Sequence, residues 1–341
     1  MSTIRKIGIL VSIFWLSMSS LNAETLSVAD RYSFSLSPLL GALYGKSEEI
    51  VYKYPGQNQY LSQLLWDLKP LWYAGLAADF GPRDPYLNHG FIADGSVKIG
   101  LPFKTGIIED RDWNNTDNSL TNYSRHDAYS HGVVMLDLSA GYSWSLKRFA
   151  TLGDAALSVY GELSYMYFSW SAENGYTQYA TYYGDPPNGY YGPWSNSIPK
   201  TPISGRGILY VQNWFVLSPG ISFKAKISRL FSLDLKLCYS PLIYCADKDD
   251  HLIRDLTFWD YCYWGNYLNG GAKVTFSLRK NLDLSLAWYY RYIDGPRGLS
   301  YEQQGSGPVY QTSNDGSGAG YSTMDVELAL RILIIGRERN P

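Results

Sequence analysis

The richest group of reactive side chains is the stretch Asp247-Lys248-Asp249-Asp250-His251, which contains one of the chain's four histidines. Residues two apart in an extended backbone point to the same side, so Asp247, Asp249 and His251 share a face. Asp249 is then placed to orient the His251 imidazole, which is the arrangement that a general base requires. This stretch predicts a pair of residues that can take up a proton.

A second acidic stretch, Glu109-Asp110-Arg111-Asp112, lies far away in the chain. Asp110 and Asp112 share a face by the same spacing rule. If the fold brings both stretches together, a water held between the two aspartates and the Asp249–His251 pair becomes an activated nucleophile. The same oxygens and nitrogen suit calcium or zinc, and both stretches could also be solvated acidic loops. Spacing alone leaves these three alternatives open.

The elements that must position these residues show a period of two. Apolar and polar side chains alternate over 230–239, 281–292 and 324–334, which is typical of strands with one apolar face. A membrane barrel puts the polar face inside, whereas a soluble sandwich or lipocalin-like barrel puts the apolar face inside. The apolar face here is rich in Leu, Trp and Tyr, which favours an outer-membrane barrel. The charges expected inside it are Asp234, Lys236, Glu327 and Arg331.

The amino terminus indicates export. Arg5 and Lys6 precede an apolar run of about 12 residues that ends in small residues at Ala23, which is the plan of a secretory signal peptide. That run is shorter than the roughly 20 residues of a membrane-spanning helix. We therefore predict a signal peptide over residues 1–23 and a single barrel domain over 24–341.

Composition excludes several other classes. With 16% aromatic residues the chain is not intrinsically disordered, and a net charge of −2 gives no sign of a nucleic-acid partner. Three cysteines are too few for a disulfide-dense scaffold. They are interpreted as packing residues, with a disulfide between Cys245 and Cys262 left open.

The predicted fold is all-β, a ten-stranded antiparallel transmembrane barrel. The strands are expected at 31–50, 61–79, 91–108, 131–145, 155–172, 206–225, 229–244, 255–277, 281–293 and 321–335. Short and long connections alternate between them, and barrels of this kind have short periplasmic turns and long outer loops. Both acidic stretches are then predicted to lie on long loops at the outer rim.

Several stretches, taken together in their order and spacing, resemble the omptins, which are outer-membrane proteases of Gram-negative bacteria. The resemblance covers nearly the whole chain after the signal peptide. The matching stretches are 45–52 (GKSEEIVY), 62–66 (SQLLW), 110–113 (DRDW), 124–126 (SRH), 168–172 (FSWSA) and 247–251 (DKDDH).

The resemblance implies a ten-stranded barrel in the outer membrane and an endopeptidase whose nucleophile is water. It implies no metal, no cofactor and no acyl-enzyme. The family's catalytic residues match Asp110, Asp112, Asp249 and His251. Ser124 and His126 match positions that support this group.

The resemblance also implies the specificity. Two acids of the family select Arg or Lys before the cut, and they match Glu49 and Asp247. A pocket with two carboxylates favours a cation and rejects neutral or acidic side chains. Ile108 falls where this pocket has an apolar wall. The expected substrates are peptides or proteins with basic, in particular dibasic, sites.

One family feature is missing. Omptins hold lipopolysaccharide phosphates on the outer wall through a Tyr-x-Glu-x-Arg stretch, whose places are taken here by Leu163, Tyr165 and Tyr167. A second family Arg falls at Asn213. We expect contact with outer-membrane lipid, but a weaker dependence on lipopolysaccharide than in the relatives.

Two classes of function remain. The first is the endopeptidase, with its active site facing the outside of the cell. The second is a barrel without enzymatic activity, an adhesin or a pore on the same scaffold. The set Asp110, Asp112, Asp249 and His251 separates the two, because a pore has no use for it.

Overall fold

The structure is a computed structural model that describes residues 31–146 and 154–335. The predicted signal peptide, residues 1–23, lies outside this part. A search of the described residues for a helix that is long and apolar enough to cross a membrane finds none.

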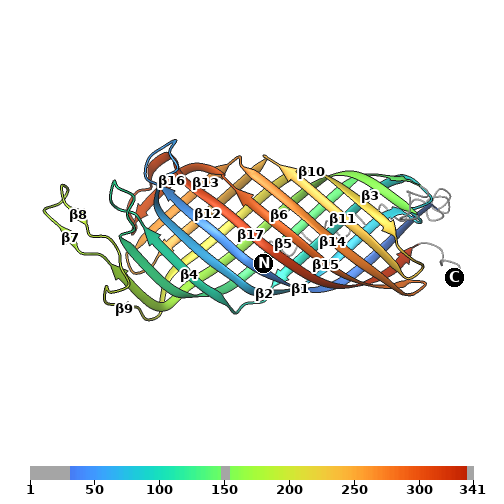
Figure 1. The fold of residues 1–341 in the computed structure, drawn as a ribbon, viewed down its shortest axis with the longest axis horizontal. Coiled ribbons are helices and arrows are strands. Elements are labelled where there is room, and N and C mark those ends of the chain that lie inside the picture. Colours follow the sequence, from blue (N-terminus) through green and yellow to red (C-terminus); the bar gives the residue numbers. More distant parts are fainter. Residues whose placement is uncertain (1–30, 147–153, 336–341) are drawn as a thin grey trace.

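The described chain is a closed antiparallel barrel (Figure 1). Six of its strands are continuous: β1 (Tyr32–Tyr52), β2 (Tyr60–Pro82), β5 (Asn122–Ser145), β6 (Ala155–Tyr179), β10 (Arg206–Lys226) and β17 (Tyr310–Ile335). Four more are interrupted once each: β3 (Gly90–Gly100) with β4 (Lys104–Asp112), β11 (Phe231–Ser240) with β12 (Ile243–His251), β13 (Leu256–Tyr263) with β14 (Asn266–Arg279), and β15 (Leu282–Asp294) with β16 (Arg297–Gln304).

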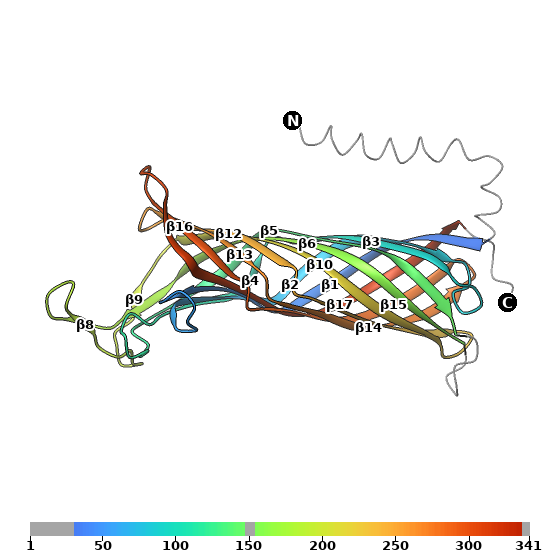
Figure 2. The same ribbon diagram turned by 90° about the horizontal axis from the view of Figure 1, so that it is seen from above.

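Pairing of β17 with β1 closes the ring, and the predicted ten-stranded barrel is confirmed. The long connection between β6 and β10 carries only the short pieces β7 (Tyr182–Tyr183), β8 (Tyr190–Tyr191) and β9 (Thr201–Pro202). Both figures show it projecting from the end where β4, β12 and β16 finish (Figures 1 and 2). The opposite end carries the start of β1 and the end of β17.

The strands are longer than the hydrophobic alternation predicts. β5, β6 and β17 have 24, 25 and 26 residues, whereas about 9–11 residues are enough to cross a membrane. Predicted loops at 109–130 and 245–254 are therefore partly wrong, because β4 continues to Asp112 and β12 continues to His251. Both acidic stretches lie on strands and not on loops.

The outward face explains this difference. Near the middle of the barrel it is apolar, with Leu163, Leu217 and Leu328 exposed toward lipid. Toward the end with long connections it carries ion pairs, such as Lys248 with Asp250 at 2.6 Å and Arg111 with Glu109 at 2.9 Å. Charges of this kind are costly in lipid, so this part of the wall stands in water. The alternation disappears there because both faces are polar, although the strands continue.

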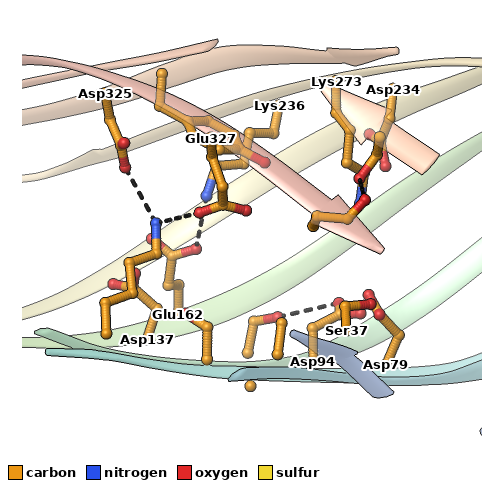
Figure 3. A pocket seen from close by; sticks show the side chains of 18 of the residues that line it. Ser37, Asp79, Asp94, Asp137, Glu162, Asp234, Lys236, Lys273, Asp325 and Glu327 are labelled. Atoms are coloured by element: carbon orange, nitrogen blue, oxygen red, sulfur yellow. Dashed lines mark hydrogen bonds and ion pairs between the residues drawn. The ribbon is translucent and has the colours of Figure 1, made fainter. Parts of the chain in front are cut away.

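The lumen within the membrane is polar, as predicted. It contains a cavity of about 190 Å³, lined by paired charges (Figure 3). Lys98 reaches Asp325 at 3.0 Å and Glu327 at 2.7 Å, and Lys236 faces Glu162 at 3.6 Å. The four charges expected inside do face the lumen, with Asp234 near Lys224 at 3.4 Å and Arg331 near Asp283 at 3.2 Å.

A layer of aromatic side chains crosses the lumen above this cavity. Its rings come from β2, β6, β10 and β17, and all are at most 2% exposed. Ring centroids lie 5.3 Å apart for Trp66 and Tyr210, 5.7 Å for Trp66 and Trp170, and 5.5 Å for Phe168 and Tyr321. Tyr321 lines the cavity below, and Tyr210 donates a hydrogen bond at 3.2 Å to Asp247 above. We refer to Trp66, Phe168, Trp170, Tyr210 and Tyr321 as the aromatic floor.

Candidate active site

Asp249 and His251 lie on the inward face at the end of β12. Oδ2 of the Asp249 carboxylate lies 2.6 Å from Nε2 of the His251 imidazole, within ion-pair distance. The Asp249 side chain is 1% exposed and that of His251 is 13% exposed. The pair predicted from the i, i+2 spacing is thus formed, with a buried acid behind a partly accessible imidazole.

Asp110 and Asp112 lie on the inward face of β4, which pairs with β2 on one side and β5 on the other. The hydroxyls of Ser62 and Ser124 each approach Asp110 at 3.4 Å. Asn122 donates a hydrogen bond at 3.5 Å to Asp112. The two neighbouring strands therefore hold this second pair from both sides.

The two pairs face each other closely enough to interact. Burial raises the pKa of Asp110 well above its usual range, and the charges of Asp112 and Asp249 add to this effect. Burial also raises the pKa of Asp112, whereas the positive charges of Arg254 and His251 lower it. A carboxylate with a raised pKa beside a second carboxylate is the environment in which one proton is shared.

Ser124 and His126 extend the group along β5. The hydroxyl of Ser124 lies 3.1 Å from Nε2 of His126, and Nδ1 of His126 donates a hydrogen bond to the carbonyl of Asn174 on β6. Burial lowers the pKa of His126, so its neutral form is favoured. His126 does not contact Asp110 directly; it is connected to it through Ser124.

Glu49 and Asp247 also lie together, above the aromatic floor. Glu49 is 2% exposed and Asp247 is 5% exposed. Burial raises the pKa of Glu49 well above its usual range, followed by the negative charges of Asp249 and Asp247. Ile108, fully buried on β4, belongs to the same apolar core as the floor. The structure thus brings together Glu49 and Asp247, the two acids that were matched to the specificity pocket.

Two residues of this region were missed from the sequence. Asp260, on β13, is opposite Asp247 in the β12–β13 register and is 1% exposed. Arg254, in the turn between β12 and β13, donates a hydrogen bond to the His251 imidazole. Neither stood out, because a lone acid in a strand and a lone Arg in a turn are common on any protein surface.

Cys245 and Cys262 are direct register partners and are both buried. They are free thiols, so the disulfide left open above is absent from this structure. No group of three or more His, Cys, Asp or Glu side chains in residues 31–146 and 154–335 is arranged to hold a metal ion.

The chain and its fold are similar to known proteins. Residues 30–333 match the family model described as the Omptin family. The plasminogen activator of Yersinia pestis is 26% identical over 336 residues, which are 96% of this chain and 99% of that protein. The fold is similar to that of the outer membrane protease OmpT from Escherichia coli, with a TM-score of 0.75 and 18% identity over 89% of this chain and 97% of that one. The chain therefore belongs to the omptin family of outer-membrane proteases.

Proposed function

We propose that this protease is an endopeptidase that cuts after Arg or Lys at the outer surface of the cell. The observation that carries the proposal is the meeting of the Asp110–Asp112 and Asp249–His251 pairs above the aromatic floor. Each pair alone is a common polar feature. Their charges interact across the lumen from β4 and β12, and acids that face a base are what the activation of a water requires.

In the proposed mechanism, water is the nucleophile. His251 accepts its proton at Nδ1, the nitrogen that Arg254 contacts in this structure and must release, as the water attacks the peptide carbonyl. Asp249, at Nε2, stabilises the imidazolium that results. Asp110 and Asp112 hold the water from the other side. Because their pKa values are raised by burial, this pair retains a proton that it can give to the departing amine. No covalent intermediate with the enzyme forms.

Specificity is assigned to Glu49 and Asp247. Both carboxylates are buried within reach of Asp249, so a cation between them would sit directly beside the proposed base. A positive side chain relieves the repulsion among these acids, which a neutral or acidic side chain cannot do. Ile108 offers an apolar surface for the aliphatic part of the substrate.

The test compares intact cells that carry wild type, His251→Ala or His89→Ala, each given a fluorogenic Arg-Arg peptide. His251→Ala should lose about 10²–10⁴-fold in rate, the usual effect of removing a general base. His89, exposed in the turn between β2 and β3, is the matched control and should retain full activity. Wild-type turnover by His251→Ala would contradict the mechanism, and cuts mainly after acidic or aromatic residues would contradict the pocket assignment.

The alternative of a pore finds no support in the lumen. The stacked rings of the aromatic floor and the ion pairs below it lie across the path that an open channel needs. An adhesin on this scaffold would leave the peptide uncut in the same assay.

A further inference from the structure

The pocket assigned to the basic side chain contains a third carboxylate, that of Asp260. It lies on β13, directly opposite Asp247 on β12. Burial raises the pKa of Asp260 to about 7, the charge of Asp249 adds to this, and the side chains of Ser300 and Ser317 lower it. Its charge in turn raises the pKa values of Asp247 and Glu49, so the three acids share one space.

Several oxygens in this space lack a donor. Within the described part of the chain, no hydrogen-bond partner reaches Oδ1 of Asp260, Oε2 of Glu49 or Oδ1 of Asp249, although all three atoms are buried. A buried carboxylate oxygen without a donor is costly, and its cost is removed when a ligand supplies one. These three oxygens therefore point to a ligand that brings several N–H groups.

The acceptors are dispersed around the pocket. Glu49 comes from β1, Asp249 from β12 and Asp260 from β13, and these acids do not form a group that could hold a metal ion. A metal or an ammonium group concentrates its charge at one point. A guanidinium group has five N–H donors that diverge in a plane, and it can reach acceptors on separate walls.

Building on the proposed function, we infer that Asp260 is a third specificity residue, which makes this pocket select Arg over Lys before the scissile bond. Glu49 and Asp247 supply the preference for a cation, and Asp260 adds the acceptor that only the wider guanidinium reaches together with them. Asp260 binds substrate in this assignment and takes no part in proton transfer.

The experiment uses full-length protein in detergent and two peptides that differ only in Arg or Lys before the cut. Wild type should cleave the Arg peptide at least about tenfold more efficiently than the Lys peptide. Asp260→Asn should raise KM for the Arg peptide by about 10- to 100-fold, the effect of losing a charge-assisted hydrogen bond. Its kcat, and its kcat/KM for the Lys peptide, should change by less than about threefold.

Two further variants control the result. Asp250→Asn removes a carboxylate from the outer face of the neighbouring strand β12. It should leave KM and kcat unchanged for both peptides. Asp260→Ser also removes the carboxylate, and it should raise KM for the Arg peptide as Asp260→Asn does. Both Asp260 variants should fold at least as stably as wild type, since removing one of several mutually repelling buried acids relieves strain. A purely structural role of Asp260 predicts the opposite.

The outcomes separate this inference from the function on which it rests. If wild type cuts after neither Arg nor Lys, the proposed function fails. If wild type cuts after both equally well, or if Asp260→Asn keeps the wild-type KM for Arg, the role of Asp260 is wrong while the protease assignment stands. As a probe independent of turnover, agmatine should inhibit wild type more strongly than putrescine, and Asp260→Asn should remove that difference.

Discussion

His251 is held between a negative and a positive neighbour. Oδ2 of Asp249 lies 2.6 Å from its Nε2, and Arg254 donates a hydrogen bond to the same ring. The Arg254 charge also lowers the pKa values of Asp110 and Asp112 against the effect of burial. A single cation from the β12–β13 turn therefore acts on both halves of the candidate site.

Arg254→Gln should move the working pH range of the enzyme upward. Without the positive charge, the pKa values of Asp110 and Asp112 rise further, and these acids bind protons at a higher pH than in wild type. The pair works with one carboxyl protonated and one ionised, and this singly protonated form is lost earlier as the pH falls. The acid limb of the kcat/KM profile therefore moves to higher pH. Arg254→Lys keeps the charge and should keep the limb in its wild-type position. If the acid limb of Arg254→Gln stays where it is in wild type, the Arg254 charge does not set the protonation of Asp110 and Asp112.

Single residues were predictable where spacing was informative. Asp249 with His251 and Asp110 with Asp112 were found because two carboxylates, or an acid and a base, stood two apart. Asp260 has no such partner in its own strand; it meets Asp247 only through the β12–β13 register. Contacts of this kind depend on pairing between strands, and spacing along one strand does not reveal them.

At the scale of elements, a bulge in β6 holds the supporting histidine. Asn174 and Gly175 have φ values of 56° and 106°, and the Asn174 carbonyl receives the hydrogen bond from His126. A Cβ atom on Gly175 would lie 2.0 Å from the carbonyl oxygen of Arg125 on β5. The glycine permits both the unusual φ and the close approach of the two strands.

Gly175→Ala should therefore disturb both stability and activity. Strain at this φ costs roughly 1–3 kcal/mol, and relief of the clash would move the carbonyl that positions His126. Folded and heat-unfolded barrel migrate differently in a gel, and we expect the midpoint temperature of this change to be lower than in wild type. We also expect a reduced kcat. Gly161→Ala on the same strand is the matched control, because a Cβ there meets nothing within 4 Å. Equal midpoints for the two variants would show that the bulge tolerates a side chain.

The outer wall of β6 and β10 carries no cation at Leu163, Tyr165, Tyr167 and Asn213, the positions that the resemblance matched to a phosphate site. Tyr165 packs on Phe215 with ring centroids 4.8 Å apart, and its hydroxyl donates a hydrogen bond at 3.0 Å to Asn213. Leu163 is exposed toward lipid. This surface suits acyl chains and the membrane interface, but it cannot neutralise a phosphate.

Refolded protein should therefore be active in detergent without lipopolysaccharide. The measurement is the rate of peptide cleavage before and after lipopolysaccharide is added, with protein never exposed to it as the starting material. We expect a change of less than about threefold, because the charge-assisted contacts that would couple binding to activity are missing. A rise from near zero to full activity would contradict this reading of Leu163, Tyr165 and Tyr167.

The whole barrel was predictable because its central part obeys one rule, apolar outside and polar inside. The strand extensions were not, because above the membrane Glu109, Arg111, Lys248 and Asp250 make the outer face polar too. The aromatic floor was also hidden. Its rings come from four strands, whereas the Trp and Tyr residues of the sequence were expected on the outward, apolar face.

At the scale of the whole molecule, the barrel should conduct no ions. Trp66, Trp170 and Tyr210 stack across the lumen, and the ion pairs of Lys98 with Asp325 and Glu327 lie beyond them. Reconstitution into a planar bilayer should give no steady ion current, while the same preparation cleaves peptide. A stable open conductance in that preparation would favour the pore. Trp66→Ala removes one ring of the aromatic floor, so this variant is the one to examine for an ion current that wild type lacks.

A lumen closed by the aromatic floor gives the proposed enzyme a single entrance. The intact peptide and both of its fragments must pass through the same opening. In the proposed site, the fragment that ends in the new Arg should leave last, because Glu49, Asp247 and Asp260 would still hold its guanidinium. Product inhibition follows from the shape of the barrel: short peptides ending in Arg should compete with substrate, and release of that fragment should limit turnover on good substrates.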